Sequence, residues 1–149
     1  MSVRSKSEAV RVIVALYRQF ERAIRDEDMS LTHYRTLLYL STGPKRAGAI
    51  AAEAAVKKPT VSATLNVLRH KGWVEDRADP ADGRVTQVVL TGAGRTRIKA
   101  FEATLAKRIE AVLPGFDVAE LHAVLGGAYR TLAESRDARQ KDIERQFLD

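Results

Sequence analysis

Two short segments of the chain carry side chains suited to binding a polyanion. The first combines basic, hydroxyl and amide residues: Lys57, Lys58, Pro59, Thr60, Ser62 and Asn66. Hydroxyl groups can hydrogen-bond to phosphates or to base edges, and backbone amides at the start of a helix favour a phosphate. The two lysines add positive charge at the same place. This combination predicts contacts with a nucleic acid.

The second segment is a turn that carries an arginine. Residues 79–83 have the composition of a turn, and Arg84 follows directly. A protruding guanidinium suits the narrow, electronegative minor groove of A·T-rich DNA. Asp82 could hold that guanidinium in a bidentate pair and so set its direction. We add Arg77, which lies in the segment before the turn, to the expected DNA contacts.

The positive charge of the chain is concentrated around these two segments. The formal net charge is +6; residues 45–97 hold ten Lys or Arg against five Asp or Glu, and the other 96 residues hold fifteen against fourteen. A localised basic region favours a polyanionic partner, because neutralising phosphates releases counterions. On charge alone, a solvated basic surface without a partner is an equally good interpretation.

Helical periodicity predicts the first elements that must position these residues. Apolar side chains recur at three- and four-residue spacing over residues 8–25, which predicts a long amphipathic helix. Thr32 is expected to cap a second helix, which the pair Gly43-Pro44 ends. A short alanine-rich segment follows over residues 47–55.

The next predicted helix carries the first polyanion-binding segment. Pro59 lies where a helix tolerates proline, in the first turn, and Gly72 is expected to end the helix. Val61, Leu65 and Leu68 are spaced by four and three, so they should share one buried face. On or near the opposite face we expect Pro59, Ser62, Ala63, Asn66 and His70.

The periodicity after Gly72 changes to that of a β-hairpin. Residues 73–78 and the β-branched segment 85–90 flank the turn, and Trp73 is expected to pack at the base of the hairpin. Helical periodicity returns after Thr91 and is interrupted at Pro114-Gly115. The order of three helices and a hairpin is that of a winged helix-turn-helix, in which the last helix can enter the major groove.

The predicted fold class is therefore mainly α with a small β-hairpin wing. We expect a single domain over residues 1–149, with a winged helix-turn-helix lobe at about 30–94. The helices at about 8–28 and 95–149 carry apolar stripes that a compact lobe has little room to bury. Packing against a second copy is the economical solution, so we expect a homodimer.

Several classes of protein are excluded or disfavoured. The chain has no cysteine, which excludes disulfides, thiolate metal sites and nucleophilic thiols. It has no phosphate-binding loop, no Gly-x-Ser-x-Gly and no His-Glu-x-x-His motif, so we expect neither catalysis nor a cofactor. The three histidines are widely spaced, and no metal site is expected. There is no apolar run of roughly 18 residues and no signal-peptide pattern, so we expect a cytoplasmic location.

The segment from residue 59 to residue 94 resembles the MarR family, the multiple antibiotic resistance regulators. The strongest match is residues 82–84, Asp-Gly-Arg, followed after five residues by Leu-Thr-Gly-Ala-Gly at 90–94, which fits the family pattern Asp-x-Arg and Leu-Thr-x-x-Gly. Residues 59–62 with Leu68, and then residues 72–74, are similar to the family's recognition helix and the glycine that opens its wing.

Other positions extend the resemblance or depart from it. Leu31-Thr32, followed by Leu37 and Leu40, resembles the second helix of the family. Family members often carry an arginine directly after the serine of the recognition helix, where this chain has Ala63. The residues that could replace that contact are Lys57, Lys58 and Asn66.

The resemblance implies a sequence-specific DNA-binding transcriptional regulator. It implies a homodimeric repressor that binds a pseudo-palindromic operator in double-stranded DNA and is released by a small aromatic or anionic ligand. Tyr17 and Tyr34 are candidates for the ligand cleft, although both could instead be core residues. The alternative is a winged-helix module that binds DNA non-specifically, or binds protein, without a ligand response.

Overall fold

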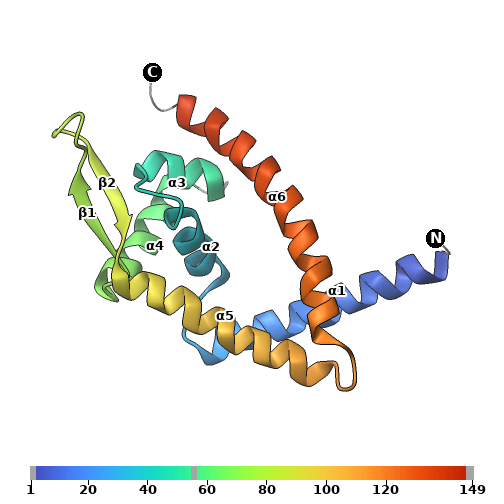
Figure 1. The fold of residues 1–149 in the computed structure, drawn as a ribbon. Helices are drawn as coiled ribbons and strands as arrows, with labels where there is room; N and C mark the ends of the chain where they lie inside the picture. The colour runs from blue at the N-terminus through green and yellow to red at the C-terminus, as the bar shows by residue number, and fades with distance from the viewer. Residues whose placement is uncertain (1–2, 55–56, 147–149) are drawn as a thin grey trace.

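The structure is a computed structural model that describes the backbone of residues 3–54 and 57–146 and the side chains of residues 6–54, 57–135 and 141. Six helices and two strands follow one another in this region (Figure 1). In chain order they are α1 (Val3–Asp26), α2 (Leu31–Leu40), α3 (Ala47–Ala54), α4 (Lys58–His70), β1 (Val74–Ala78), β2 (Thr86–Leu90), α5 (Gly92–Val112) and α6 (Val118–Gln146). This order confirms the predicted fold class.

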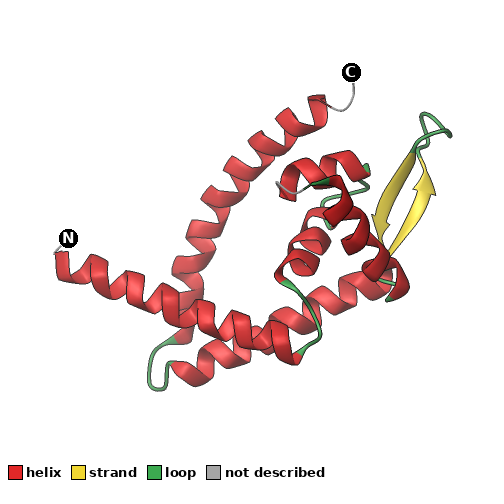
Figure 2. Cartoon of the chain, turned by 180° about the vertical axis from the view of Figure 1, so that it is seen from behind, coloured by secondary structure: helices red, strands yellow, loops and turns green. Residues whose placement is uncertain are grey.

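The elements form a lobe with long helices extending from it. Helices α2, α3 and α4 and the hairpin gather at one end of the molecule, and the hairpin projects from this lobe (Figure 2). Helix α5 leads away from the base of the hairpin and packs against α1, whereas α6 turns back and contacts α3. Among the described residues, no helix is long and apolar enough to cross a bilayer.

The core lies between α2, α4, β2 and α5. Its most deeply buried large side chains are Leu37, Leu40, Leu65, Leu68, Val88, Leu90 and Phe101. In α4, Val61, Leu65 and Leu68 are all less than 5% exposed, at 4%, 1% and 0%, which confirms the predicted buried face. Because this face is fixed against the core, the opposite face of α4 must face solvent.

Helix α2 begins one residue after Ser30, so the prediction that Thr32 caps it was wrong. The Ser30 Oγ accepts a hydrogen bond from the backbone N–H of His33 at 3.0 Å. In return, the Nδ1 of His33 accepts one from the Ser30 N–H at 3.3 Å. This reciprocal pair satisfies backbone donors at both ends of the first turn, which explains why Ser30 is the cap.

The residues predicted to bound α4 are confirmed, and each strand of the hairpin begins one residue later than predicted. Pro59 lies in the first turn of α4, and Gly72 follows the helix with φ of +70°, in the left-handed region that favours glycine. The strands pair antiparallel with Val74 opposite Leu90. The backbone of Lys45, before α3, also pairs with Val88 of β2, so the start of α3 lies beside the hairpin.

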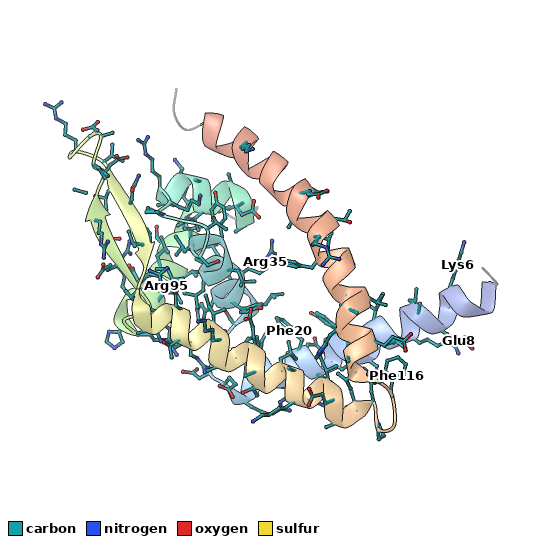
Figure 3. All side chains as sticks on the ribbon, in the orientation of Figure 1. Lys6, Glu8, Phe20, Arg35, Arg95 and Phe116 are labelled. Carbon is teal, nitrogen blue, oxygen red and sulfur yellow. The ribbon has the colours of Figure 1, made fainter. Side chains whose placement is uncertain are left out.

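The single chain leaves apolar surface on α1 and α6 uncovered. Four apolar side chains of α1 are more than half exposed: Val10, Ile13, Val14 and Tyr17. On α6, Val124, Tyr129 and Leu132 are more than 60% exposed, at 65%, 63% and 66%. Further along α1, Phe20 packs where α1, α2 and α5 meet (Figure 3).

Candidate nucleic-acid interface

The solvent face of α4 carries all the residues predicted for it. Those exposed there are Lys57, Lys58, Pro59, Thr60, Ser62, Ala63, Asn66 and His70. Lys57 is the N-cap and contributes no side-chain hydrogen bond to the first turn. Its ammonium and that of Lys58 therefore add to the positive end of the helix dipole without neutralising it, an arrangement that favours an anion.

Asn66 is held by a chain of polar side chains that joins α4 to β1. Its Oδ1 accepts a hydrogen bond from Arg69 Nη1 at 3.0 Å. The same guanidinium donates to Asp76 Oδ1 of β1, at 2.9 Å from Nη2 and 3.2 Å from Nε. The side-chain carbonyl of Asn66 thus already accepts a hydrogen bond from Arg69 at the surface, so a contact with DNA would come from its amide NH₂ group. Sequence reasoning missed Arg69.

The wing presents Arg84 to solvent at the end of its turn. The carboxylate of Asp82 accepts a hydrogen bond from the backbone N–H of Arg84, at 3.0 Å from Oδ1. The bidentate pair predicted between Asp82 and the guanidinium does not form in the described part of the chain. The physical reason is that a carboxylate reaches the amide two residues on without ordering a long arginine side chain.

Arg77 lies on the exposed side of β1. Its Nε donates to Oε1 of Glu75 at 2.8 Å, because residues two apart in a strand face the same side of the sheet. This pairing offsets part of the positive charge that the sequence places at the wing. A contact between Arg77 and DNA stays a prediction.

A buried carboxylate that sequence reasoning missed lies where β1 enters the wing turn. Asp79 is 8% exposed. It accepts hydrogen bonds from the Ala81 N–H at 2.9 Å, the Gln87 amide at 2.9 Å and Arg46 Nη2 at 3.3 Å. The Ala81 bond and the Arg46 guanidinium hold the pKa of Asp79 below its usual value.

Trp73 packs at the base of the wing, as predicted. The ring lies against the core, with Lys71 Nζ 4.8 Å and Arg97 Cζ 5.5 Å from its centre. At the same junction, Arg95 at the start of α5 donates to the Leu90 carbonyl at 3.2 Å (Figure 3). The wing is therefore attached firmly to α5.

The two tyrosines predicted for a ligand cleft do not line the same cavity. Tyr17 borders an open cavity of about 600 Å³ between the end of α1 and the start of α2, which Arg25 and His33 also line. Tyr34 instead packs its ring against Phe101 and donates its hydroxyl to Glu102 at 3.0 Å. Tyr34 is therefore packed against the core, which was the alternative to a role in the ligand cleft.

Comparison with known proteins finds a family match in the DNA-binding lobe. A family model described as MarR family matches residues 27–85, which contain α2, α3, α4, β1 and the wing turn. The structure is similar to that of the MepR–DNA complex of S. aureus, with a TM-score of 0.61, 20% identity, and coverage of 86% of this chain and 98% of that chain. Residues 27–85 thus match the MarR family, and the chain shares the fold of the MepR structure.

Two other similar proteins extend this comparison. The HTH-type transcriptional repressor IacR of Pseudomonas putida is 26% identical over 102 residues, which cover 68% of this chain and 61% of IacR. The match thus spans less than two thirds of that relative. The Bordetella bronchiseptica BpsR structure has a TM-score of 0.55 at 20% identity, covering 85% of this chain and 91% of that chain, and concerns regulation of DNA binding by 6-hydroxynicotinic acid.

Proposed function

We propose that this chain is a MarR-family, sequence-specific repressor that binds double-stranded DNA as a homodimer. Helix α4 would enter the major groove, and Arg84 on the wing would enter the adjacent minor groove. One observation carries this proposal. The buried face of α4 fixes the helix in the lobe, and its exposed face begins with Lys57 and Lys58. The DNA complex of MepR and the repressor name of IacR support it.

The dimer would form through α1 and the helices after Thr91. Its support is the set of apolar side chains on α1 and α6 that one copy leaves exposed. A two-fold axis between the α1 and α6 helices of two copies would place the two α4 helices in successive major grooves, about 34–36 Å apart. The domain would then consist of a DNA-binding lobe at about 30–94 between dimerisation helices.

Release of DNA would follow the binding of a small aromatic or anionic ligand. The open cavity beside Tyr17 supports this because the guanidinium of Arg25 lines it and can bind a carboxylate. The ligand-regulated DNA binding of BpsR is a precedent among proteins of this fold. In the dimer, the spacing between the two DNA-binding lobes could take two values, one of which fits DNA. A ligand can weaken DNA binding only if its affinity differs between these two spacings. A panel of phenolic acids that binds without changing DNA affinity would contradict this part.

The proposed function is tested by footprinting the DNA that flanks the protein's own gene, followed by competition with unrelated duplex. We expect the protected site to be preferred by roughly 10³-fold or more. Equal competition by unrelated DNA would refute a sequence-specific repressor and favour a non-specific winged-helix module. Since the chain has no cysteine, peroxide should not release the DNA through thiol chemistry.

A further inference from the structure

The amide of Asn66 lies in the middle of the exposed face of α4. Residues four apart lie on the same side of a helix, so Asn66 shares one stripe with Ser62 and His70. All three are exposed, and Ala63, which lies beside them, carries only a methyl group. A base edge that approaches the middle of this face would therefore meet the amide of Asn66.

A neighbouring arginine determines which way this amide is turned. The Oδ1 of Asn66 accepts a hydrogen bond from Nη1 of Arg69 at 3.0 Å. A guanidinium has N–H donors and no acceptor, so the NH₂ group of the amide cannot take the place of the oxygen. In the part of the chain whose side chains the structure describes, the NH₂ group of Asn66 donates to no other residue. The donor end of the amide is thus left for a ligand.

Arg69 is itself held by Asp76 of β1. Its Nη2 and Nε donate to Oδ1 of Asp76, at 2.9 and 3.2 Å. The side chains are 34% and 42% exposed, and ion pairs this exposed contribute little to stability. The two bonds nevertheless fix the plane of the guanidinium, so the bond that it donates to Asn66 has a fixed direction. The pair therefore orients the amide more than it stabilises the fold.

This orientation limits what Asn66 can recognise on a base pair. In the major groove each pair presents acceptor atoms and one amino donor, which belongs to adenine or cytosine. An unconstrained asparagine uses both ends of its amide and binds N6 and N7 of adenine. The oxygen of Asn66 has a second lone pair, but a base amino group there would lie beside the donors of Arg69, and facing donors repel. Only the NH₂ group is suited to a base.

We propose that Asn66 reads one base pair of each half-site through acceptor atoms alone, such as guanine O6 or thymine O4. Arg69, anchored by Asp76, is the positioning residue that excludes the bidentate contact with adenine. This inference rests on the proposed function, and it names the determinant of specificity in the middle of α4.

The first step of the test locates the base pair. Operator affinity is measured for duplexes substituted at each pair in turn, with the wild type and with Asn66→Ala. At one pair of each half-site, Asn66→Ala should lose a discrimination of roughly 2- to 12-fold, the value of one neutral hydrogen bond. A wild type that prefers its operator, with an Asn66→Ala protein that discriminates equally at every pair, would overturn the inference.

The second step removes the amino group of that pair, with purine in place of adenine or 2-pyrimidinone in place of cytosine. Asn66→Ala is the reference, because it reports the effect of the analogue on the duplex itself. The wild type should lose no more affinity than this reference. A larger loss would show that the Asn66 carbonyl binds the amino group, and would overturn the inference even if no Arg69 variant folds.

The third step tests Arg69 and Asp76 with the same two duplexes. Arg69→Met cannot donate, so it frees the carbonyl and should lose more affinity than the reference when the amino group is removed. Arg69→Lys has donors only and should behave as the wild type does. Asp76→Ala should fall between them. The loss of charge cancels, because both duplexes have the same phosphates. An Arg69→Met protein that is folded by circular dichroism and follows the wild type would overturn the positioning role.

The matched control is Arg108→Met on α5. Arg108 is also an ion-paired arginine about one third exposed, at 31%, but its partner is Asp26 at the end of α1. Its loss should leave the response to the analogue unchanged, and a response like that of Arg69→Met would overturn the inference. These outcomes leave the proposed function in place, because the wild type still prefers its operator. A wild type without any preference among duplexes would refute the proposed function itself.

Discussion

The Nζ of Lys71 lies 2.6 Å from the Oδ2 of Asp28 and 3.2 Å from its backbone oxygen. Lys71 is the C-cap of α4, whereas Asp28 lies in the connection between α1 and α2 and has a left-handed φ of +48°. Beside this contact, Arg97 of α5 donates to Oε2 of Glu27 at 2.7 Å. The connection that leads from the long helix α1 into the lobe is thus tied to the proposed recognition helix and to α5.

Glu27→Gln should reduce the loss of stability in acid. The hydrogen bond from Arg97 is the main reason that the pKa of Glu27 lies below its ordinary value. A carboxylate with a lowered folded pKa stabilises the protein above the unfolded pKa of about 4.3, and this contribution is lost as the pH falls through the folded value. Urea denaturation at about pH 7 and at steps below about pH 4.3 measures the effect. Glu110→Gln, at an exposed position on α5, is the control. An acid dependence equal to that of the wild type would refute the prediction.

His33→Gln should remove a pH dependence from the start of α2. Burial, with the nearby charge of Lys71, lowers the pKa of His33, whereas Asp28 opposes the shift. The neutral ring is therefore favoured in the folded state. Its contribution is complete above the unfolded pKa of about 6.5, falls as the pH drops below that value, and is constant below the folded pKa. Glutamine at this position retains a capping box with Ser30.

The measurement for His33→Gln is the free energy of unfolding between about pH 5 and pH 8, compared with the wild type. His122→Gln, at an exposed position on α6, controls for the loss of a histidine elsewhere. We expect the His122 variant to follow the wild type and the His33 variant to be flatter. A His33→Gln protein that still loses stability with the wild-type slope would show that the capping histidine does not titrate in this range.

Gly94→Ala should destabilise the junction between the wing and α5. A Cβ atom at this position would lie 2.2 Å from the Trp73 backbone oxygen and 2.6 Å from Leu90 Cδ1. Relieving that overlap requires the backbone to shift, at a cost of roughly 1–3 kcal/mol. Gly92→Ala is the matched control in the same helical turn, since a Cβ there meets no atom within 4 Å. Thermal unfolding should show a lower Tm for the first variant only; equal Tm values would contradict the prediction.

Ile13→Glu in α1 and Leu132→Glu in α6 should each give a monomer. Both side chains are about two thirds exposed in the single chain, at 65% and 66%, and lie on the helices proposed to form the dimer. A carboxylate buried there without a partner opposes association. The control is Thr86→Glu, on the exposed side of the wing, which introduces the same charge away from α1 and α6. Light scattering should give a dimer for the wild type and for this control. A wild-type monomer that binds its operator tightly would disprove the proposed dimer.

Arg84→Ala should weaken operator binding while leaving the fold and the dimer intact. Arg84 is exposed, and its guanidinium forms no ion pair among the described residues. The salt slope of log K should flatten by about 0.9 for each phosphate that is no longer neutralised, and the penalty should be larger beside A·T-rich flanks than beside G·C-rich ones. Lys57→Ala should weaken binding about equally across sequences. Asp82→Ala should lower operator affinity, as Arg84→Ala does, but by a smaller amount. Salt titrations with circular dichroism measure these effects; an unchanged affinity and slope for Arg84→Ala would remove the wing from the mechanism.

The sequence by itself determined the elements and the two faces of the proposed recognition helix. The spacing of Val61, Leu65 and Leu68 predicted which face of α4 is buried, and Pro59 and Gly72 predicted its ends. The turn before Arg84 predicted the hairpin. These features are readable because helix periodicity and turn chemistry depend on residues that are close in sequence.

Only the tertiary structure decided which polar groups meet. Arg46 and Asp79 are separated by 33 residues, Lys71 and Asp28 by 43, and Tyr34 and Glu102 by 68. In the sequence, Asp79 looks like any other aspartate in a turn, and no neighbouring residue shows that its carboxylate is buried. Contacts of this kind form when the packing of apolar faces brings distant segments together. The partner of a polar side chain therefore depends on the whole core and not on its neighbours along the chain.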